Sequence, residues 1–205
     1  MNIKINCHSS ICIDDEFYFD PFDVEASPQN AKVIFITHSH FDHLDIKSIK
    51  KVMNDKTIFV CTEDSKKILE KNFKNKIVLV RPNMSGEVLG VKYETFPAYN
   101  FGHHHFKELG FVGYTVKIDG TRYTICGDTD LTEELANIKT DVLLVPIGGT
   151  FTMDAQDGAR LANIIKPKLV IATHYNHIEG TADKSAEKEF LKYLDKNIPH
   201  EFLIK

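Results

Sequence analysis

The sequence lacks long apolar runs, paired cysteines and a strong excess of either charge. No apolar stretch is long enough to cross a bilayer, so we expect no membrane span. The N-terminal segment MNIKINCHSS has no basic region followed by a long apolar stretch, so we expect no signal peptide. The net charge is only -4, from 25 basic and 29 acidic residues, which argues against a protein that binds nucleic acid or membranes mainly by electrostatic attraction.

Cysteine is scarce and widely spaced. The sequence has four cysteines and no CxxC pair: Cys7, Cys12, Cys61 and Cys126. A domain of this size folds without disulfides, so these residues are expected to be reduced thiols. We therefore expect a cytoplasmic protein.

The length and the apolar content suit one globular domain over residues 1–205. Hydrophobic residues make up 42% of the chain, which allows a sizeable core. We find no linker, low-complexity tract or internal repeat. The apolar patterns predict short strands first, then alternating strands and helices, then strands and the alternation again. This order favours an α/β (α+β) fold of two sheets packed face to face, with helices outside.

The predicted elements are given by residue range. Strands are expected at 3–6, 10–13, 16–19, 33–36, 57–60, 77–80, 87–97, 111–118, 121–125, 142–145, 169–172 and 201–204. Helices are expected at 44–53, 63–73, 132–138, 154–165 and 184–195. Turns are expected at Asp14-Asp15, Ser85-Gly86 and Asp119-Gly120, which are typical turn sequences.

The strongest functional signal is the segment THSHFDH at residues 37–43, which follows an apolar run that predicts a buried strand. Imidazole and carboxylate are standard ligands for zinc, and they also suit iron or manganese. In extended backbone His38 and His40 point the same way, so they can share one ion. The turn that follows can aim Asp42 and His43 at a second ion. The alternative is a polar loop that is merely rich in histidine.

Two further strand ends carry ligand-type residues. Gly127-Asp128-Thr129 follows the predicted strand 121–125, and His174 follows the predicted strand 169–172. Taken alone, the first is a common turn sequence and the second is typical of a hydrogen-bonded structural histidine. Active sites of layered α/β folds gather at strand ends, so the three positions together indicate one metal site.

Together these motifs resemble those of the metallo-β-lactamase-fold hydrolase superfamily. The matching segments are THSHFDH at 37–43, GDT at 127–129 and THY at 173–175. Four more segments are similar to the branch of small metal-dependent hydrolases related to ascorbate-6-phosphate lactonase: CHSS at 7–10, FDPF at 19–22, PAYN at 97–100 and GGTFTMDA at 148–155. The resemblance covers almost the whole chain in order, and the HxHxDH motif is its most specific part.

That resemblance implies a metallo-β-lactamase fold, a four-layer αββα sandwich of two mixed sheets with a binuclear metal centre at one edge. His38 and His40 would bind the first ion, Asp42, His43 and His174 the second, and Asp128 would bridge both. A metal-bound hydroxide would be the nucleophile, which makes His38, His40 and Asp42 the predicted catalytic residues. The expected cofactors are two divalent ions, zinc first, with manganese or iron as alternatives.

One position departs from the superfamily pattern. The family supplies a third histidine to the first ion from a strand end before the GDT motif, where this chain has Asn100. An amide oxygen is a poor ligand for zinc and suits harder ions. His103, His104 and His105 follow closely, and His105 is the predicted replacement ligand. The alternative is a polar loop of solvated or substrate-facing histidines.

Other residues carry weaker predictions. Tyr99 and Tyr175 flank expected metal-site positions and are predicted, with Asn100, to contact the substrate. Core packing is the alternative for both tyrosines. His8, in the CHSS segment, is expected either close to the site or as a hydrogen-bonded structural residue.

The leading functional hypothesis is a metal-dependent hydrolase that cleaves an ester, lactone or phosphodiester bond in a small metabolite. We expect a small-molecule substrate and no nucleic-acid or membrane partner, and the sequence leaves homo-oligomers open. One alternative is a degenerate metal-binding or sensing protein without catalysis. Asp42 and Asp128 argue against it, because two carboxylates packed among histidines repel each other without cations. A di-iron redox protein is the other alternative, since the same ligands serve iron.

Overall fold

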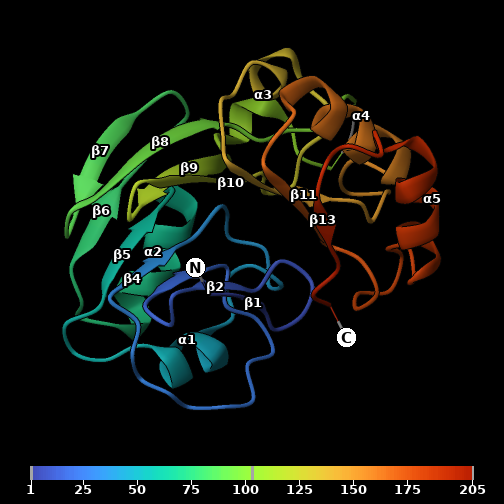
Figure 1. Ribbon diagram of the computed structural model, residues 1–205. Helices are drawn as coiled ribbons and strands as arrows, with labels where there is room; N and C mark the ends of the chain where they lie inside the picture. The colour runs from blue at the N-terminus through green and yellow to red at the C-terminus, as the bar shows by residue number, and fades with distance from the viewer. Residues whose placement is uncertain (1, 103, 205) are drawn as a thin grey trace. The chain divides into compact units, whose positions relative to one another are not determined.

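The structure is a computed structural model that describes residues 2–102 and 104–204. The chain divides into two parts, which we call unit 1 (residues 2–81 and 204) and unit 2 (residues 82–102 and 104–203). Each unit is built on one mixed β-sheet with helices (Figure 1). Two mixed sheets with helices confirm the predicted α/β class, while the single domain over residues 1–205 stays a prediction.

The sheet of unit 1 has six strands that follow one another in sequence order. They are β1 (Ile3–Ile5), β2 (Ile11–Ile13), β3 (Phe17–Phe19), β4 (Val33–Phe35), β5 (Ile58–Cys61) and β6 (Ile77–Leu79). β1 to β3 pair antiparallel, and β3 to β6 pair parallel. The predicted turn between β2 and β3 is confirmed, since Asp14 and Asp15 both have a positive φ, 52° and 58°, which aspartate tolerates.

Helices α1 (Ile46–Val52) and α2 (Glu63–Asn72) connect the parallel strands of unit 1 and pack on its sheet. Asp45 begins α1 by accepting hydrogen bonds from the backbone N–H groups of Lys47 and Ser48. The core that the helices share with the strands includes Ile34, Ile36, Ile49, Val52, Phe59 and Leu69. β4 lies between β3 and β5 and is wholly buried. The chain therefore leaves the carboxyl end of β4 from inside the unit, directly into residues 37–43.

The sheet of unit 2 has seven strands in the order β13-β12-β11-β10-β9-β8-β7. They are β7 (Ser85–Val88), β8 (Val91–Pro97), β9 (Val112–Ile118), β10 (Thr121–Ile125), β11 (Val142–Pro146), β12 (Leu169–Thr173) and β13 (His200–Glu201). β7 to β10 pair antiparallel, and β10 to β13 pair parallel. Because β10, β11 and β12 are parallel neighbours, their carboxyl ends share one edge of the sheet.

The helices of unit 2 are α3 (Glu133–Ala136), α4 (Ala155–Ile165) and α5 (Ser185–Tyr193), with a single 3-10 turn at Lys107–Leu109. α4 packs on β11 and beside α5 (Figure 1). Gly158 allows this approach, since a Cβ at that position would lie 2.9 Å from Ile147 Cγ2. Asp154 caps α4 as predicted, accepting the Asp157 N–H at 2.8 Å.

The predicted strand 87–97 is wrong, because this segment forms the hairpin of β7 and β8. Leu89 and Gly90 make its two-residue turn, with φ angles of 48° and 82°. Leucine seldom adopts a positive φ, so the apolar pattern conceals the turn. The predicted turn Ser85-Gly86 is wrong too, since these residues begin β7. Tyr93 lies over Gly86 there, and a Cβ on the glycine would lie 2.4 Å from the Tyr93 hydroxyl oxygen.

The remaining elements are present, with ends that differ from the predicted ranges by at most two residues, except at the last strand. That strand is His200–Glu201 and not 201–204, because it pairs only with Val170 and Ile171 of β12. All four cysteines are free and buried, and burial raises the pKa of Cys7 and Cys61 to about 12. In the described ranges, no helix is long and apolar enough to cross a membrane.

Candidate metal centre

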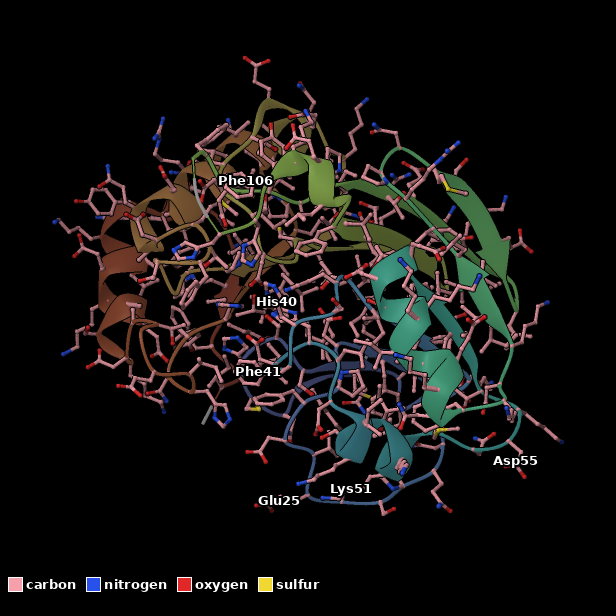
Figure 2. All side chains as sticks on the ribbon, turned by 180° about the vertical axis from the view of Figure 1, so that it is seen from behind. Glu25, His40, Phe41, Lys51, Asp55 and Phe106 are labelled. Carbon is pink, nitrogen blue, oxygen red and sulfur yellow. The ribbon has the colours of Figure 1, made fainter. Side chains whose placement is uncertain are left out.

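The loop after β4 gathers imidazoles in unit 1. It turns at once, because the His40 carbonyl oxygen accepts the N–H groups of His43 at 3.0 Å and Leu44 at 2.8 Å. The ring centroids lie 4.6 Å apart for His38 and His40, and 4.1 Å apart for His38 and His43. His38 and His43 are buried, whereas His40 and the neighbouring Phe41, both labelled in Figure 2, are exposed. The structure thus brings three imidazoles of the predicted set together.

A buried carboxylate outside the predicted ligand set holds this loop. Asp20 follows β3, and its Oδ1 accepts the Thr37 backbone N–H at 2.8 Å. Its Oδ2 accepts the Thr37 hydroxyl at 2.6 Å and lies 2.8 Å from His43 Nδ1. Thr37 Oγ1 in turn lies 3.0 Å from His38 Nδ1. Burial raises the pKa of Asp20, and the contacts with His43 and Thr37 oppose that rise.

These contacts decide which nitrogen of each ring can bind a metal. Asp20 Oδ2 accepts the proton of His43 Nδ1, which leaves Nε2 of that ring as the donor atom. The Thr37 hydroxyl donates its proton to Asp20, so the hydroxyl oxygen accepts the proton of His38 Nδ1. This leaves His38 Nε2, too, as the nitrogen that can bind a metal. The sequence signal for Asp20 was its place in the FDPF segment at 19–22.

Asp20→Asn is expected to weaken metal binding by about 10- to 100-fold, because the asparagine NH2 group faces His43 Nδ1 and favours the wrong tautomer. The measurement is zinc affinity by competition with a chromophoric chelator. Asp45→Asn is the control, since asparagine also caps a helix, and its metal affinity should match the wild type. Equal affinities for the wild type and Asp20→Asn would mean that Asp20 holds the fold and not the ligands.

Asp42 lies between two imidazoles of unit 1. Its Oδ2 is 3.1 Å from His8 Nε2 and 3.5 Å from His43 Nε2. His8 comes from the turn between β1 and β2 and is fully buried. Of the two alternatives for His8, the structure therefore places it close to the predicted ligands Asp42 and His43.

In unit 2 the parallel strands bring Asp128 and His174 together. Asp128 follows β10 and His174 follows β12, at the edge that their carboxyl ends share. His174 Nε2 lies 3.1 Å from Asp128 Oδ1 and 3.2 Å from its Oδ2. Gly148, which follows β11 between them, is required there, because a Cβ would lie 2.0 Å from the His174 carbonyl oxygen. A glycine at this position thus allows the two strand ends, whose contacting residues are 46 positions apart in sequence, to lie together.

Asn100, the departure from the superfamily pattern, contacts His105. Asn100 Nδ2 donates to Asp130 Oδ1 at 3.0 Å, which turns the amide oxygen toward His105 Nδ1 at 2.6 Å. The Asn100 backbone N–H also donates to the His105 carbonyl oxygen at 2.8 Å. His105 Nε2 then faces Asp128, 3.8 Å from its Oδ2. Asn100 therefore orients an imidazole toward the Asp128 carboxylate, and its own amide oxygen accepts a hydrogen bond from that ring.

The other two histidines of this segment are placed differently. His103 lies outside the described residues. His104 is exposed, and its ring centroid lies 4.9 Å from that of Phe151, edge to face. Of the two described candidates, only His105 is buried beside Asp128.

The two predicted substrate tyrosines point to glutamates of unit 2. Tyr99 donates to Glu134 Oε2 at 3.2 Å, and Lys107 lies over its ring, 4.8 Å from the centroid. Tyr175 is fully buried and donates to Glu187 Oε1 of α5 at 2.7 Å. Burial raises the pKa of the Tyr175 hydroxyl above its ordinary value. These contacts favour core packing for Tyr175, the alternative named for it above.

The donor chemistry of both units fits divalent cations. In each unit a buried carboxylate faces imidazole Nε2 atoms: Asp42 faces His8 and His43, and Asp128 faces His105 and His174. Nitrogen and oxygen donors of these types bind zinc, iron and manganese. An unprotonated Nε2 and a carboxylate oxygen both offer electron pairs, and a cation between them turns their repulsion into attraction.

The fold and these donors define a metal-dependent hydrolase of the β-lactamase superfamily, and the chain belongs to that superfamily. A family model described as a beta-lactamase superfamily domain matches residues 5–174. The predicted resemblance is thereby confirmed, whereas the relation to ascorbate-6-phosphate lactonase stays a prediction.

Similar proteins carry the same designation. The UPF0173 metal-dependent hydrolase of Nanoarchaeum equitans is 30% identical over 189 residues, which cover 86% of this chain and 84% of the relative. The UPF0173 metal-dependent hydrolase of Carboxydothermus hydrogenoformans is 30% identical over 195 residues, covering 86% and 85%. A solved structure from Parabacteroides distasonis, assigned to the metal-dependent hydrolases, superposes with a TM-score of 0.77 and 26% identity, covering 99% of this chain and 93% of that one.

Proposed function

We propose that this hydrolase works with two divalent metal ions and cleaves an ester, lactone or phosphodiester bond in a small metabolite. The observation that carries the proposal is the repeated pairing of a buried carboxylate with imidazole Nε2 atoms, once in unit 1 and once in unit 2. Burying a carboxylate costs free energy that a nearby cation offsets. Zinc is the first choice of metal, with manganese or iron as alternatives.

The proposed ligands follow the sequence motifs. His38, His40 and His105 bind the first ion, Asp42, His43 and His174 the second, and Asp128 is shared. When bound, two cations lower the pKa of water and polarise the oxygen of the scissile group. The protein's own part is to hold the donors, since Asp20 and Asn100 each orient a ring through its Nδ1 atom.

A small substrate is supported by the charge of the protein. The net charge of -4 supplies no strong attraction for nucleic acid or an anionic membrane surface. We therefore propose a small-molecule substrate and no nucleic-acid or membrane partner, and the four free cysteines support the proposal of a cytoplasmic location. Light scattering on the purified protein measures whether it forms homo-oligomers.

Elemental analysis of protein purified without chelator tests the proposal, with about two ions per chain as the expected result. A chelator should abolish turnover of a phosphodiester, a lactone or an ester, tested with nitrophenyl compounds and γ-lactones. Adding back zinc, manganese or iron one at a time should restore it and identify the best metal. A protein that takes up none of the three metals, or binds them without hydrolysing any of the three bond classes, would instead fit the binding or sensing alternative.

A further inference from the structure

His8 forms a compact group with Asp42 and His43 inside unit 1. Its Nε2 lies 3.1 Å from Asp42 Oδ2, and that oxygen lies 3.5 Å from His43 Nε2. The donor atoms of the three residues all lie within 4.8 Å of one another. All three residues are buried, with His8 and His43 fully removed from solvent.

These distances match the separation between neighbouring ligand atoms of one metal ion. Two ligand atoms, each 2.0–2.1 Å from a tetrahedral ion, lie about 3.3 Å apart. The separations of 3.1 Å and 3.5 Å fall on either side of that value. The group could therefore take up an ion with small side-chain movements.

The contacts of His43 aim its second ring nitrogen at Asp42. Its Nδ1 lies 2.8 Å from Asp20 Oδ2, which orients the ring and leaves Nε2 as the nitrogen for a metal. Nε2 lies 3.5 Å from Asp42 Oδ2, longer than a good hydrogen bond and close to the separation of two ligand atoms on one ion. A cation held by this carboxylate and the two imidazoles would offset the cost of burying the carboxylate.

The backbone around His8 is held in an uncommon conformation. His8 has a φ of 49°, in the left-handed region, which few residues other than glycine adopt. The Asn6 N–H donates to the Ser10 carbonyl oxygen at 2.9 Å, and the Ser10 N–H to the Cys7 carbonyl oxygen at 2.8 Å. Ser10 Oγ accepts the Phe22 N–H at 3.0 Å, which ties the turn to the segment after β3. A costly conformation that its surroundings impose is typical of functional positions.

We propose that His8 Nε2 is a metal ligand, which with Asp42 and His43 makes a two-histidine, one-carboxylate set within unit 1. The proposal rests on the proposed function, because it concerns the second of the two ions. Three protein ligands from one unit would anchor this ion firmly, and imidazole and carboxylate ligands of this kind suit zinc, iron and manganese.

The competing role for His8 is a hydrogen bond from its Nε2–H to Asp42, without metal ligation. His8→Gln separates the two roles, because glutamine keeps an N–H donor for Asp42 but is a poor zinc ligand. Zinc affinity is measured by chelator competition on the full chain, and the number of imidazoles per zinc by X-ray absorption fine structure. We expect one of the two zinc ions to bind at least about tenfold more weakly in His8→Gln and His8→Ala alike, with fewer imidazoles per zinc. His200→Gln, a change at an exposed histidine, is the matched control and should leave both values unchanged.

The outcomes separate this proposal from the function on which it rests. If the wild type binds about two zinc ions and His8→Gln binds them as tightly, with the same number of imidazoles, His8 is only a hydrogen-bond partner of Asp42. If the wild type binds no zinc, the proposed function and the role of His8 fall together. Weakened binding in both His8 variants, beside an unaffected His200→Gln, supports ligation.

Discussion

Asp128→Ala is expected to lower the metal content from about two ions per chain to one or fewer, and to remove measurable turnover. Asp128 is almost fully buried, and both of its oxygens lie within 3.2 Å of His174 Nε2. His105 Nε2 lies 3.8 Å from Oδ2. In the proposed arrangement this carboxylate is the ligand that both ions share, so its loss weakens both sites at once. Elemental analysis after gel filtration and a turnover assay measure the two effects.

Asp157→Ala is the matched control for Asp128→Ala. Asp157 is a carboxylate of α4 in a surface ion pair with Arg160 at 2.8 Å, and such pairs contribute little. Its loss should leave metal content and turnover at wild-type values. Retention of about two ions and normal turnover by Asp128→Ala would remove Asp128 from the metal centre.

His38→Ala is expected to reduce kcat/KM by more than about 100-fold, beyond the usual effect of changing a residue that only orients a ligand. His38 is buried, and the Thr37 hydroxyl beside its Nδ1 leaves Nε2 as the donor atom. Alanine keeps the loop backbone but removes that donor. The measurement is steady-state kinetics on the best substrate of the screen, at a metal concentration that saturates the wild type.

His177→Ala is the comparison for His38→Ala, since His177 is exposed and outside the proposed ligand set. Its kcat/KM should stay within about twofold of the wild type, as for most surface substitutions. A second comparison at raised zinc concentration tells whether His38→Ala has lost affinity or also the capacity for turnover. Equal losses in His38→Ala and His177→Ala would contradict the assignment of residues 37–43 as the principal ligand loop.

Local sequence predicted that the histidines of residues 37–43 lie together, because they are close in the chain, while metal binding by these residues stays a prediction. The run before Thr37 reads as a buried strand, and the structure has β4 there, with His38, His40 and His43 grouped after it. Strand periodicity and strand ends also indicated Asp128 and His174, which parallel pairing brings together. The β7–β8 hairpin was predicted wrongly, because its turn depends on a leucine at positive φ that no local pattern reveals.

The sequence by itself determined the class of fold, the motif at residues 37–43 and the chemistry of the donors. Only the tertiary structure decided which residues orient those donors. Asp20 reaches His43 across 23 residues because β3 and β4 are parallel neighbours, and Asp130 turns the Asn100 amide toward His105 from 30 residues away. Hydrogen bonds of this kind form only when two segments far apart in the chain are placed to within a few tenths of an ångström. Residue spacing alone carries no such information, whereas the packing of strands fixes it.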